Sequence, residues 1–337
     1  MSTIQDLFAE QVARTPDAEA IAHRDGSLTY AEFNARANGL AHRLIDAGLT
    51  PGTGVAFLCD RTPLLPIALM GILKARGYYI PLDPTYPAAR IDGILADAQP
   101  FALVTDRDAE GLRAMGIQAD TRVVQLRGDD AGHGTNPPAG RADDLVYSIY
   151  TSGSTGKPKG TLNFQRGAVN VNRWMIDGFG VGPQTRALVA TSIGFDITSK
   201  AICSPLLAGG TVVLYDSPVY DPPRIRAAIV EFGVNTLNHT PTGLLGLIED
   251  GSAATYAQMA GVRRLLILGE ALRLDRFRNW LTHADTRPAL FNGYGPTECA
   301  DTIAAHEVTD ADLSTGAGSA LRSTLKLALT GKASMKV

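Results

Sequence analysis

Residues 151–160 read TSGSTGKPKG and follow directly on an apolar stretch. Successive backbone N–H groups in a glycine-rich turn form a concave surface that binds anions. The hydroxyl side chains add hydrogen-bond donors, and Lys157 and Lys159 add positive charge suited to phosphate. The spacing is not that of a Walker A loop, because only two residues separate Gly153 from Gly156. The segment therefore predicts a polyphosphate-binding loop, with a flexible surface loop as the alternative.

A second segment, FNGYGPTECAD at 291–301, offers complementary chemistry. Phe291 is expected to end a short strand, and the Gly-Tyr-Gly-Pro turn that follows should expose an aromatic ring. Tyr294 could stack on a nucleobase, Thr297 could bond phosphate, and Glu298 could hold Mg²⁺ between phosphate oxygens. A structural turn with a structural tyrosine is the alternative for this segment taken alone.

Short apolar stretches typical of buried strands alternate with amphipathic stretches typical of helices. Thr29 followed by Glu32 predicts a capped helix start, and Gly48 predicts the end of that helix. Strand–helix alternation with apolar strands predicts an α/β fold with largely parallel sheets covered by helices. The predicted helices are 4–14, 29–49, 63–77, 88–99 and 221–233. The predicted strands are 52–60, 78–83, 101–106, 122–126, 145–151, 187–191, 211–216, 236–240 and 264–269, and a hairpin is predicted around Asp25-Gly26.

Composition narrows the function classes. The 337 residues carry a net charge of −3 and no basic run, which argues against nucleic acid and anionic membranes as partners. Cys59, Cys203 and Cys299 lie too far apart for a disulfide framework or a metal motif. The first residues lack a secretory signal pattern, and no apolar run approaches the ~20 residues of a membrane span. A cytoplasmic location is expected.

Five segments together resemble the adenylate-forming superfamily, and specifically the amino-acid adenylation domains of nonribosomal peptide synthetases. In the family's order along the chain they are LTYAEFNARANGLAHRL (28–44), LKARGYYIPLDPTYPAARI (73–91), LVYSIYTSGSTGKPKG (145–160), FDIT (195–198) and NGYGPTE (292–298). The resemblance implies the large N-terminal domain of that fold, with layered sheets flanked by helices. It also implies that an amino-acid carboxylate attacks the α-phosphorus of ATP and that pyrophosphate leaves. The aminoacyl group would then load a phosphopantetheine thiol on a separate carrier protein, alongside other synthetase modules.

The resemblance assigns roles residue by residue. Lys157, Thr297 and Glu298 would be catalytic, with Glu298 binding Mg²⁺, and Tyr294 would stack on adenine. For Gly269–Ala271 a plain helix-entry turn is the alternative to ligand contact. The ATP-binding residues implied are Thr151, Ser152, Gly153, Ser154, Thr155, Gly156, Lys157, Gly269, Glu270, Ala271, Asn292, Gly293, Tyr294 and Thr297.

Asp196 is the residue that the resemblance assigns to the substrate's α-ammonium group, since a buried charge needs a partner. The alternative is an N-cap for a helix starting at Thr198. Lys200 and Asp301 make the implied pocket polar, or else they neutralise each other. We expect a small or medium polar amino acid as the substrate. The implied pocket residues are Asp196, Ile197, Lys200, Asn238, Leu266, Leu268, Gly293, Asp301 and Thr302.

The resemblance fades toward the C-terminus. We expect an adenylation core at 1–315 and a divergent, disordered tail at 316–337, in which Lys332 offers only a faint match to the family's lysine-bearing last motif. The family's small C-terminal lid domain, with its catalytic lysine, is not recognised. We therefore expect nucleotide binding but weak adenylation, so whether this chain is itself an active enzyme stays open. The alternatives are an acyl- or aryl-CoA synthetase-type ligase fragment, or a catalytically inactive remnant.

Overall fold

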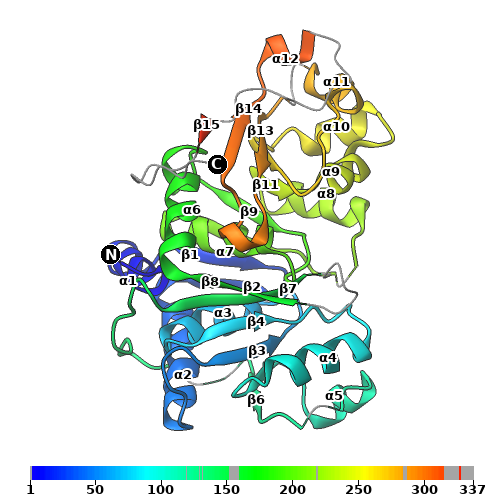
Figure 1. Cartoon of the computed structure of the whole chain (residues 1–337). Coiled ribbons are helices and arrows are strands. Elements are labelled where there is room, and N and C mark those ends of the chain that lie inside the picture. Colours follow the sequence, from blue (N-terminus) through cyan, green and yellow to red (C-terminus); the bar gives the residue numbers. More distant parts are fainter. Residues whose placement is uncertain are drawn as a thin grey trace. The chain divides into compact units, whose positions relative to one another are not determined.

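The computed structural model of the chain (Figure 1) describes residues 2–118, 120–128, 130, 132–151, 159–217, 219–283, 287–314 and 326–327. The chain divides into two compact units. Unit 1 comprises Met1–Val169, Ser192–Asp196 and Asp216–Val219. Unit 2 comprises Asn170–Thr191, Ile197–Tyr215 and Tyr220–Val337.

The sheet of unit 1 follows the order β6-β5-β3-β4-β7-β8. Its strands are β3 (Gly54–Leu58), β4 (Tyr78–Pro81), β5 (Leu103–Thr105), β6 (Val123–Gln125), β7 (Leu145–Thr151) and β8 (Lys159–Phe164). The pairings are parallel except for β7 with β8, which is antiparallel. Unit 1 also contains an antiparallel hairpin of β1 (Glu19–His23) and β2 (Gly26–Thr29).

Helices cover both faces of this sheet, as parallel strands require. The helices of unit 1 are α1 (Ile4–Arg14), α2 (Tyr30–Asp46), α3 (Leu64–Lys74), α4 (Ala88–Ala98) and α5 (Ala109–Ala114). Alternate residues of β3 and β4 face opposite ways. Ala56 and Ile80 pack with Ile91 and Leu95 of α4. α3 packs on β3 and β4, and α2 packs on α3.

The strands of unit 2 follow the order β15-β14-β13-β12-β11-β9-β10. They are β9 (Arg186–Val189), β10 (Thr211–Leu214), β11 (Thr236–His239), β12 (Arg264–Ile267), β13 (Ala289–Tyr294), β14 (Ala304–Glu307) and β15 (Lys326–Leu327). Pairing is parallel from β10 to β13 and antiparallel from β13 to β15. The antiparallel end is a hairpin, and its connecting loop carries much of the candidate site.

The helices of unit 2 fall into two groups. Residues from Asn170 on of α6 (Gln165–Asp177), together with α7 (Asp196–Leu207), contribute to a core with β12. α8 (Pro222–Glu231), α9 (Pro241–Ile248) and α10 (Ala253–Met259) pack on one another, as Figure 1 shows beside β11. The shorter elements are the 3₁₀ turns η1 (Leu274–Arg276) and η2 (Thr297–Cys299), and the helices α11 (Arg278–Leu281) and α12 (Asp310–Ser314).

The predicted α/β fold with largely parallel sheets is confirmed. The predicted cap of α2 is also present, because the Glu32 amide donates to Thr29 Oγ1 (3.2 Å) and the Thr29 amide donates to Glu32 (2.8 Å). Two differences from the prediction concern strands. β8 was not predicted, because its sequence KGTLNF is mixed and its burial uneven. β13 runs on to Tyr294 instead of ending at Phe291, because Tyr294 pairs with Ala304 of β14.

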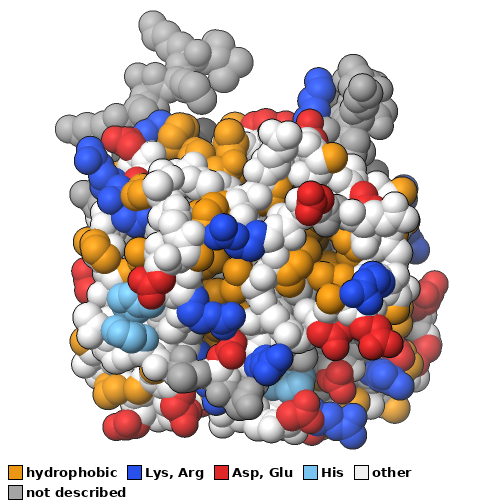
Figure 2. All heavy atoms as spheres, turned by 90° about the horizontal axis from the view of Figure 1, so that it is seen from below, with side chains coloured by type: hydrophobic (Ala, Val, Ile, Leu, Met, Phe, Trp, Pro, Cys, Tyr) orange, Lys and Arg blue, Asp and Glu red, His pale blue; other side chains and the backbone are white. Residues whose placement is uncertain are grey.

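Charge on the surface is mixed. On the face shown in Figure 2, side chains of Lys and Arg are interspersed with those of Asp and Glu, and neither sign forms a continuous field. Among the helices of the described ranges, none combines the length and apolar character needed to cross a lipid bilayer. The predicted boundary between a core at 1–315 and a tail at 316–337 stays a prediction, since nearly all of that tail lies outside the described residues.

Candidate active site

The ends of the predicted phosphate loop are held together by β7 and β8. Thr151, the last residue of β7, pairs with Lys159, the first residue of β8, in an antiparallel register. The strands therefore bring both ends of the loop to one edge of the unit 1 sheet. The remaining predicted loop residues, Ser152, Gly153, Ser154, Thr155, Gly156 and Lys157, lie outside the described residues.

Three of the predicted nucleotide-contacting residues of unit 2 lie at the turn between β13 and β14. Tyr294, at the end of β13, has an exposed fraction of 61%. Thr297 is half-buried and Glu298 is exposed on η2, which follows directly. An exposed ring, a hydroxyl and a carboxylate within five residues fit the base, phosphate and cation that the resemblance assigns. A single protein carboxylate suits Mg²⁺, which usually keeps several waters and substrate phosphates as its other ligands.

The far end of this loop turns back through an unusual backbone. Ala300 has a φ of 60° and Asp301 a φ of 82°, both in the left-handed region that non-glycine residues rarely adopt. Their turn lies directly against Gly295, where a Cβ atom would come 1.5 Å from the carbonyl oxygen of Asp301. Gly295 is a site residue that the sequence-based list missed. The Gly-Pro pair at 295–296 was its only local signal.

Asp301 and Lys200 form a buried ion pair. Lys200 Nζ donates to the Asp301 carboxylate and to Thr302 Oγ1, the latter at 2.9 Å. The exposed fractions of the Lys200 and Asp301 side chains are 2% and 4%. Of the two roles left open for this pair, the structure shows mutual neutralisation. The pair also ties helix α7 to the loop that carries Tyr294 and Glu298.

An apolar wall adjoins this pair. Ile197, one turn before Lys200 on α7, packs in one cluster with Leu266 and Leu268. Gly293 lies on the same side, since a Cβ there would be 3.2 Å from Leu266 Cδ1. Asn238 is in register with Leu266 across the parallel pair of β11 and β12, so both side chains project from the same face. The predicted pocket residues of unit 2 are thus brought together.

Helix α7 begins with Asp196, two residues earlier than the start at Thr198 that the capping alternative required. A carboxylate in the first turn of a helix is favoured by the helix dipole. Asp196 is partly buried and stands one turn before Lys200 on the same helix. The helix dipole is enough to explain an aspartate at the start of α7. Binding of an α-ammonium group by Asp196 remains a proposal.

Glu270 has a structural contact in this fold. Its Oε2 accepts hydrogen bonds from the Thr242 amide (3.2 Å) and from Thr242 Oγ1 (2.6 Å), in the first turn of α9. Gly269 has a φ of 90°, and the segment Gly269–Ala271 is exposed. The segment is therefore a turn that is hydrogen-bonded to the first turn of α9, and its exposure leaves it accessible to a ligand.

His239 lies next to Asn238 on β11, and side chains alternate along a strand, so its ring projects from the opposite face. The Thr240 amide donates to its Nδ1 (3.1 Å), and the ring meets Tyr220 edge-on at 5.7 Å between centroids. Burial lowers the pKa of His239 to about 4, while Glu270 acts in the opposite direction. The imidazole is therefore neutral at pH 7 and does not belong to the Asn238 side of the sheet.

We expect His239 to make the protein acid-sensitive. Its folded-state pKa is depressed, so the unfolded chain takes up the proton first as pH falls from 6.5 toward 4. The loss of unfolding free energy over this interval is about 3 kcal/mol. In His239→Gln, urea unfolding at pH 7.0 and 4.5 should show a clearly smaller difference than in the parent protein. An equal acid loss in both proteins would contradict this assignment.

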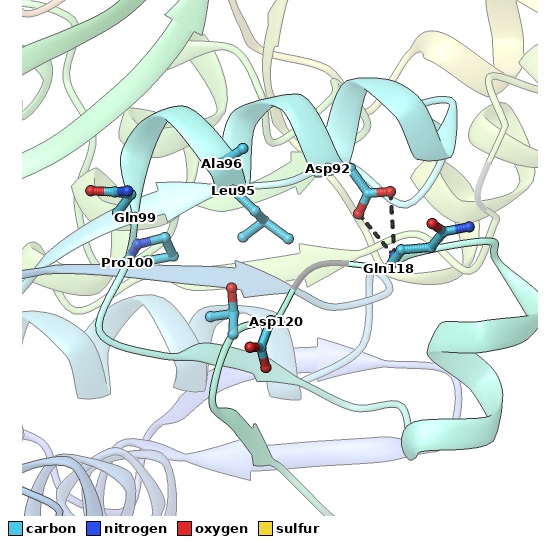
Figure 3. A pocket seen from close by; sticks show the side chains of 8 residues that line it. Asp92, Leu95, Ala96, Gln99, Pro100, Gln118 and Asp120 are labelled. Carbon is cyan, nitrogen blue, oxygen red and sulfur yellow. Dashed lines mark hydrogen bonds between the residues drawn. The ribbon is translucent and has the colours of Figure 1, made fainter.

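A separate hollow of about 640 Å³ lies on unit 1 (Figure 3). Figure 3 shows Asp92 and Leu95 of α4 pointing toward the side on which Gln118 and Asp120 lie, with Gln99 at the end of the helix. One carboxylate oxygen of Asp92 accepts a hydrogen bond from the Gln118 amide (3.0 Å). Of the predicted site residues that the structure describes, none lines this hollow.

Comparison with known proteins decides the family. Residues 8–328 match the family of AMP-binding enzymes. The chain belongs to this family. It is 36% identical over 298 residues to bacitracin synthase 3 of Bacillus licheniformis, covering 88% of this chain and 4% of that protein.

Solved structures agree with this assignment. The AMPPNP-bound nonribosomal peptide synthetase FmoA3 superposes with a TM-score of 0.83 and 27% identity over 90% of this chain and 32% of that one. A four-domain synthetase, holo-AB3403 with AMP and glycine, gives 0.78 and 27% over 91% of this chain and 22% of that one. The AMP-binding chain thus spans a small part of these large relatives. The resemblance to peptide synthetase adenylation domains is confirmed.

Proposed function

We propose that this AMP-binding chain activates an amino acid with ATP, forming an aminoacyl-AMP and releasing pyrophosphate. The observation that carries the proposal is the loop 295–303. Its near end presents Tyr294, Thr297 and Glu298, and its far end delivers Asp301 to Lys200 beside the apolar pocket wall. One loop thus serves both a nucleotide and an amino-acid side chain. Bound AMPPNP in FmoA3, and AMP with glycine in AB3403, support this reading.

In the proposed reaction, the loop at 151–157 holds the β- and γ-phosphates, with Lys157 as the main cation. Tyr294 stacks on adenine, Thr297 donates to the α-phosphate, and Glu298 holds Mg²⁺, which when bound neutralises phosphate oxygens. Asp196 binds the substrate's α-ammonium group. Both reactants are anionic, so positioning and charge neutralisation supply most of the rate.

The substrate is proposed to be a small or medium polar amino acid, and the acceptor a phosphopantetheine thiol on a separate carrier protein. The buried polar side chains of Asn238 and Thr302 support the polar character. Use of ATP and of a free thiol fits a cytoplasmic reaction.

Asp196→Asn tests the amino-acid role directly. Removing the carboxylate charge should weaken binding of a non-hydrolysable aminoacyl-sulfamoyladenosine at least tenfold, because the α-ammonium loses its counter-ion. AMPPNP contains no ammonium group, so its affinity should stay within twofold. Calorimetric titration of both ligands into both proteins gives the comparison.

The matched control is Tyr294→Ala, which should weaken both ligands because both carry adenine. If the parent protein binds AMPPNP but prefers an aryl- or fatty-acyl-sulfamoyladenosine to every aminoacyl one, the chain is an acyl- or aryl-activating ligase instead. Absence of binding by all these ligands indicates an inactive remnant.

A further inference from the structure

Two charged residues of the predicted amino-acid pocket, Lys200 and Asp301, pair with each other. We propose, on the basis of the function proposed above, that the activated amino acid has an uncharged side chain that donates a hydrogen bond, and that Asn238 Oδ1 accepts it. Asn238 would then recognise the substrate side chain, and Lys200 and Asp301 would not contact it.

The charges of Lys200 and Asp301 compensate each other. Lys200 donates to both Asp301 and Thr302, and Thr302 Oγ1 lies 3.3 Å from the second Asp301 oxygen. A cationic substrate side chain would have to take Asp301 from Lys200 and leave a buried ammonium group unpaired. An anionic one would have to take Lys200 and leave a buried carboxylate unpaired. Either exchange is strongly unfavourable, so charged side chains are rejected.

Asn238 is a further buried polar residue among the predicted pocket residues. Asn238 has an exposed fraction of 7%, and its Oδ1 has no hydrogen-bond partner among the residues that the structure describes. A buried carbonyl oxygen without a donor is costly, and a ligand that supplies the donor removes that cost. An apolar substrate would leave Oδ1 unsatisfied, so the pocket favours a hydroxyl or carboxamide side chain.

Asn238 lies on the face of the sheet that carries the apolar wall. Asn238 pairs in register with Leu266, which packs against Ile197 of α7, and Lys200 follows one turn later on that helix. The unpartnered Oδ1 therefore belongs to the face that carries the apolar wall. The neighbouring unpartnered atom, Nε2 of His239, belongs to the opposite face and takes no part.

The test uses aminoacyl-sulfamoyladenosines in matched pairs, titrated calorimetrically into the intact chain. Threonine is paired with valine, asparagine with leucine, and glutamine with glutamate, and lysine is added as a cation. We expect at least one donor-bearing member to bind at least about tenfold tighter than its partner and than the lysine compound. Tightest binding of the valine, leucine, glutamate or lysine compound overturns the inference while leaving amino-acid activation intact. Binding of none of them overturns both proposals.

Variants at Asn238 identify the acceptor. Asn238→Leu should lower the ratio of donor to apolar affinity at least tenfold, whereas Asn238→Asp, which keeps an acceptor oxygen, should retain a preference for the donor. Asn34→Leu is the control, because Asn34 on α2 of unit 1 is also buried and its Oδ1 also has no partner in the described part of the chain. Its ratio should not change. An unaltered ratio in Asn238→Leu overturns the assignment, and if that variant does not fold, the ligand series on the parent protein decides.

Discussion

Lys200→Met is expected to destabilise unit 2 by about 3–5 kcal/mol, because it leaves the Asp301 carboxylate buried without its counter-ion. Methionine keeps most of the length of the side chain, so the loss reflects charge more than volume. Unfolding in urea can be followed through tryptophan fluorescence. Both tryptophans of the chain, Trp174 and Trp280, lie in unit 2, so the signal reports on the unit that holds the ion pair.

The double variant Lys200→Met/Asp301→Asn separates charge from packing. Asparagine tolerates the left-handed φ of 82° at this position and removes the uncompensated charge. We expect it to recover more than half of the stability lost in Lys200→Met. A double variant as unstable as the sum of the two single variants would mean that the two residues do not act as a pair.

Gly295→Ala is expected to disrupt the loop 295–303. A Cβ atom at this position would lie 1.5 Å from the Asp301 carbonyl oxygen and 2.9 Å from the Ile303 amide nitrogen. Both are backbone atoms, so no side-chain rotation relieves the clash. We expect a loss of roughly 3 kcal/mol in the unfolding free energy of unit 2, at the upper end of overpacking effects. Affinity for AMPPNP should fall as well, because Glu298 belongs to the displaced loop and Tyr294 directly precedes it.

Gly182→Ala is the matched control for this variant. A Cβ atom at Gly182 would meet no atom of the described residues within 4 Å, and Gly182 also belongs to unit 2. Its substitution should change the unfolding free energy by less than about 0.5 kcal/mol. Equal stability of Gly295→Ala and Gly182→Ala would show that the loop adapts to a side chain at 295.

Local signals in the sequence predict the elements well. The cap at Thr29 and Glu32, the apolar strands β3, β11 and β12, and the helices that alternate with them depend on neighbours within a few residues. β8 escaped prediction because it lies at a sheet edge, where its residues need not be uniformly apolar. The full length of β13 depends on its pairing with β14, which the residues of β13 do not encode.

The candidate site also has residues that the sequence predicts and contacts that only the folded structure shows. The segments that resemble a known family are contiguous, so Tyr294, Thr297 and Glu298 could be selected from the sequence. The ion pair joins residues 101 positions apart, and only the folded chain shows that it is made. The sequence also does not show that Asn238 Oδ1 lacks a hydrogen-bond donor among the described residues, because this depends on which side chains the fold brings near it. The roles assigned to the loop at 152–158 stay predictions.

The buried pair also bears on how such a pocket could change its substrate in evolution or in the laboratory. Residues 200 and 301 depend on each other, because each leaves a buried charge unpaired when the other is replaced. A library that varies either position alone should therefore yield mostly unfolded chains. Position 238 is free of this constraint. Stepwise change of specificity should therefore begin at Asn238, with exchange at 200 and 301 reachable only through simultaneous substitution.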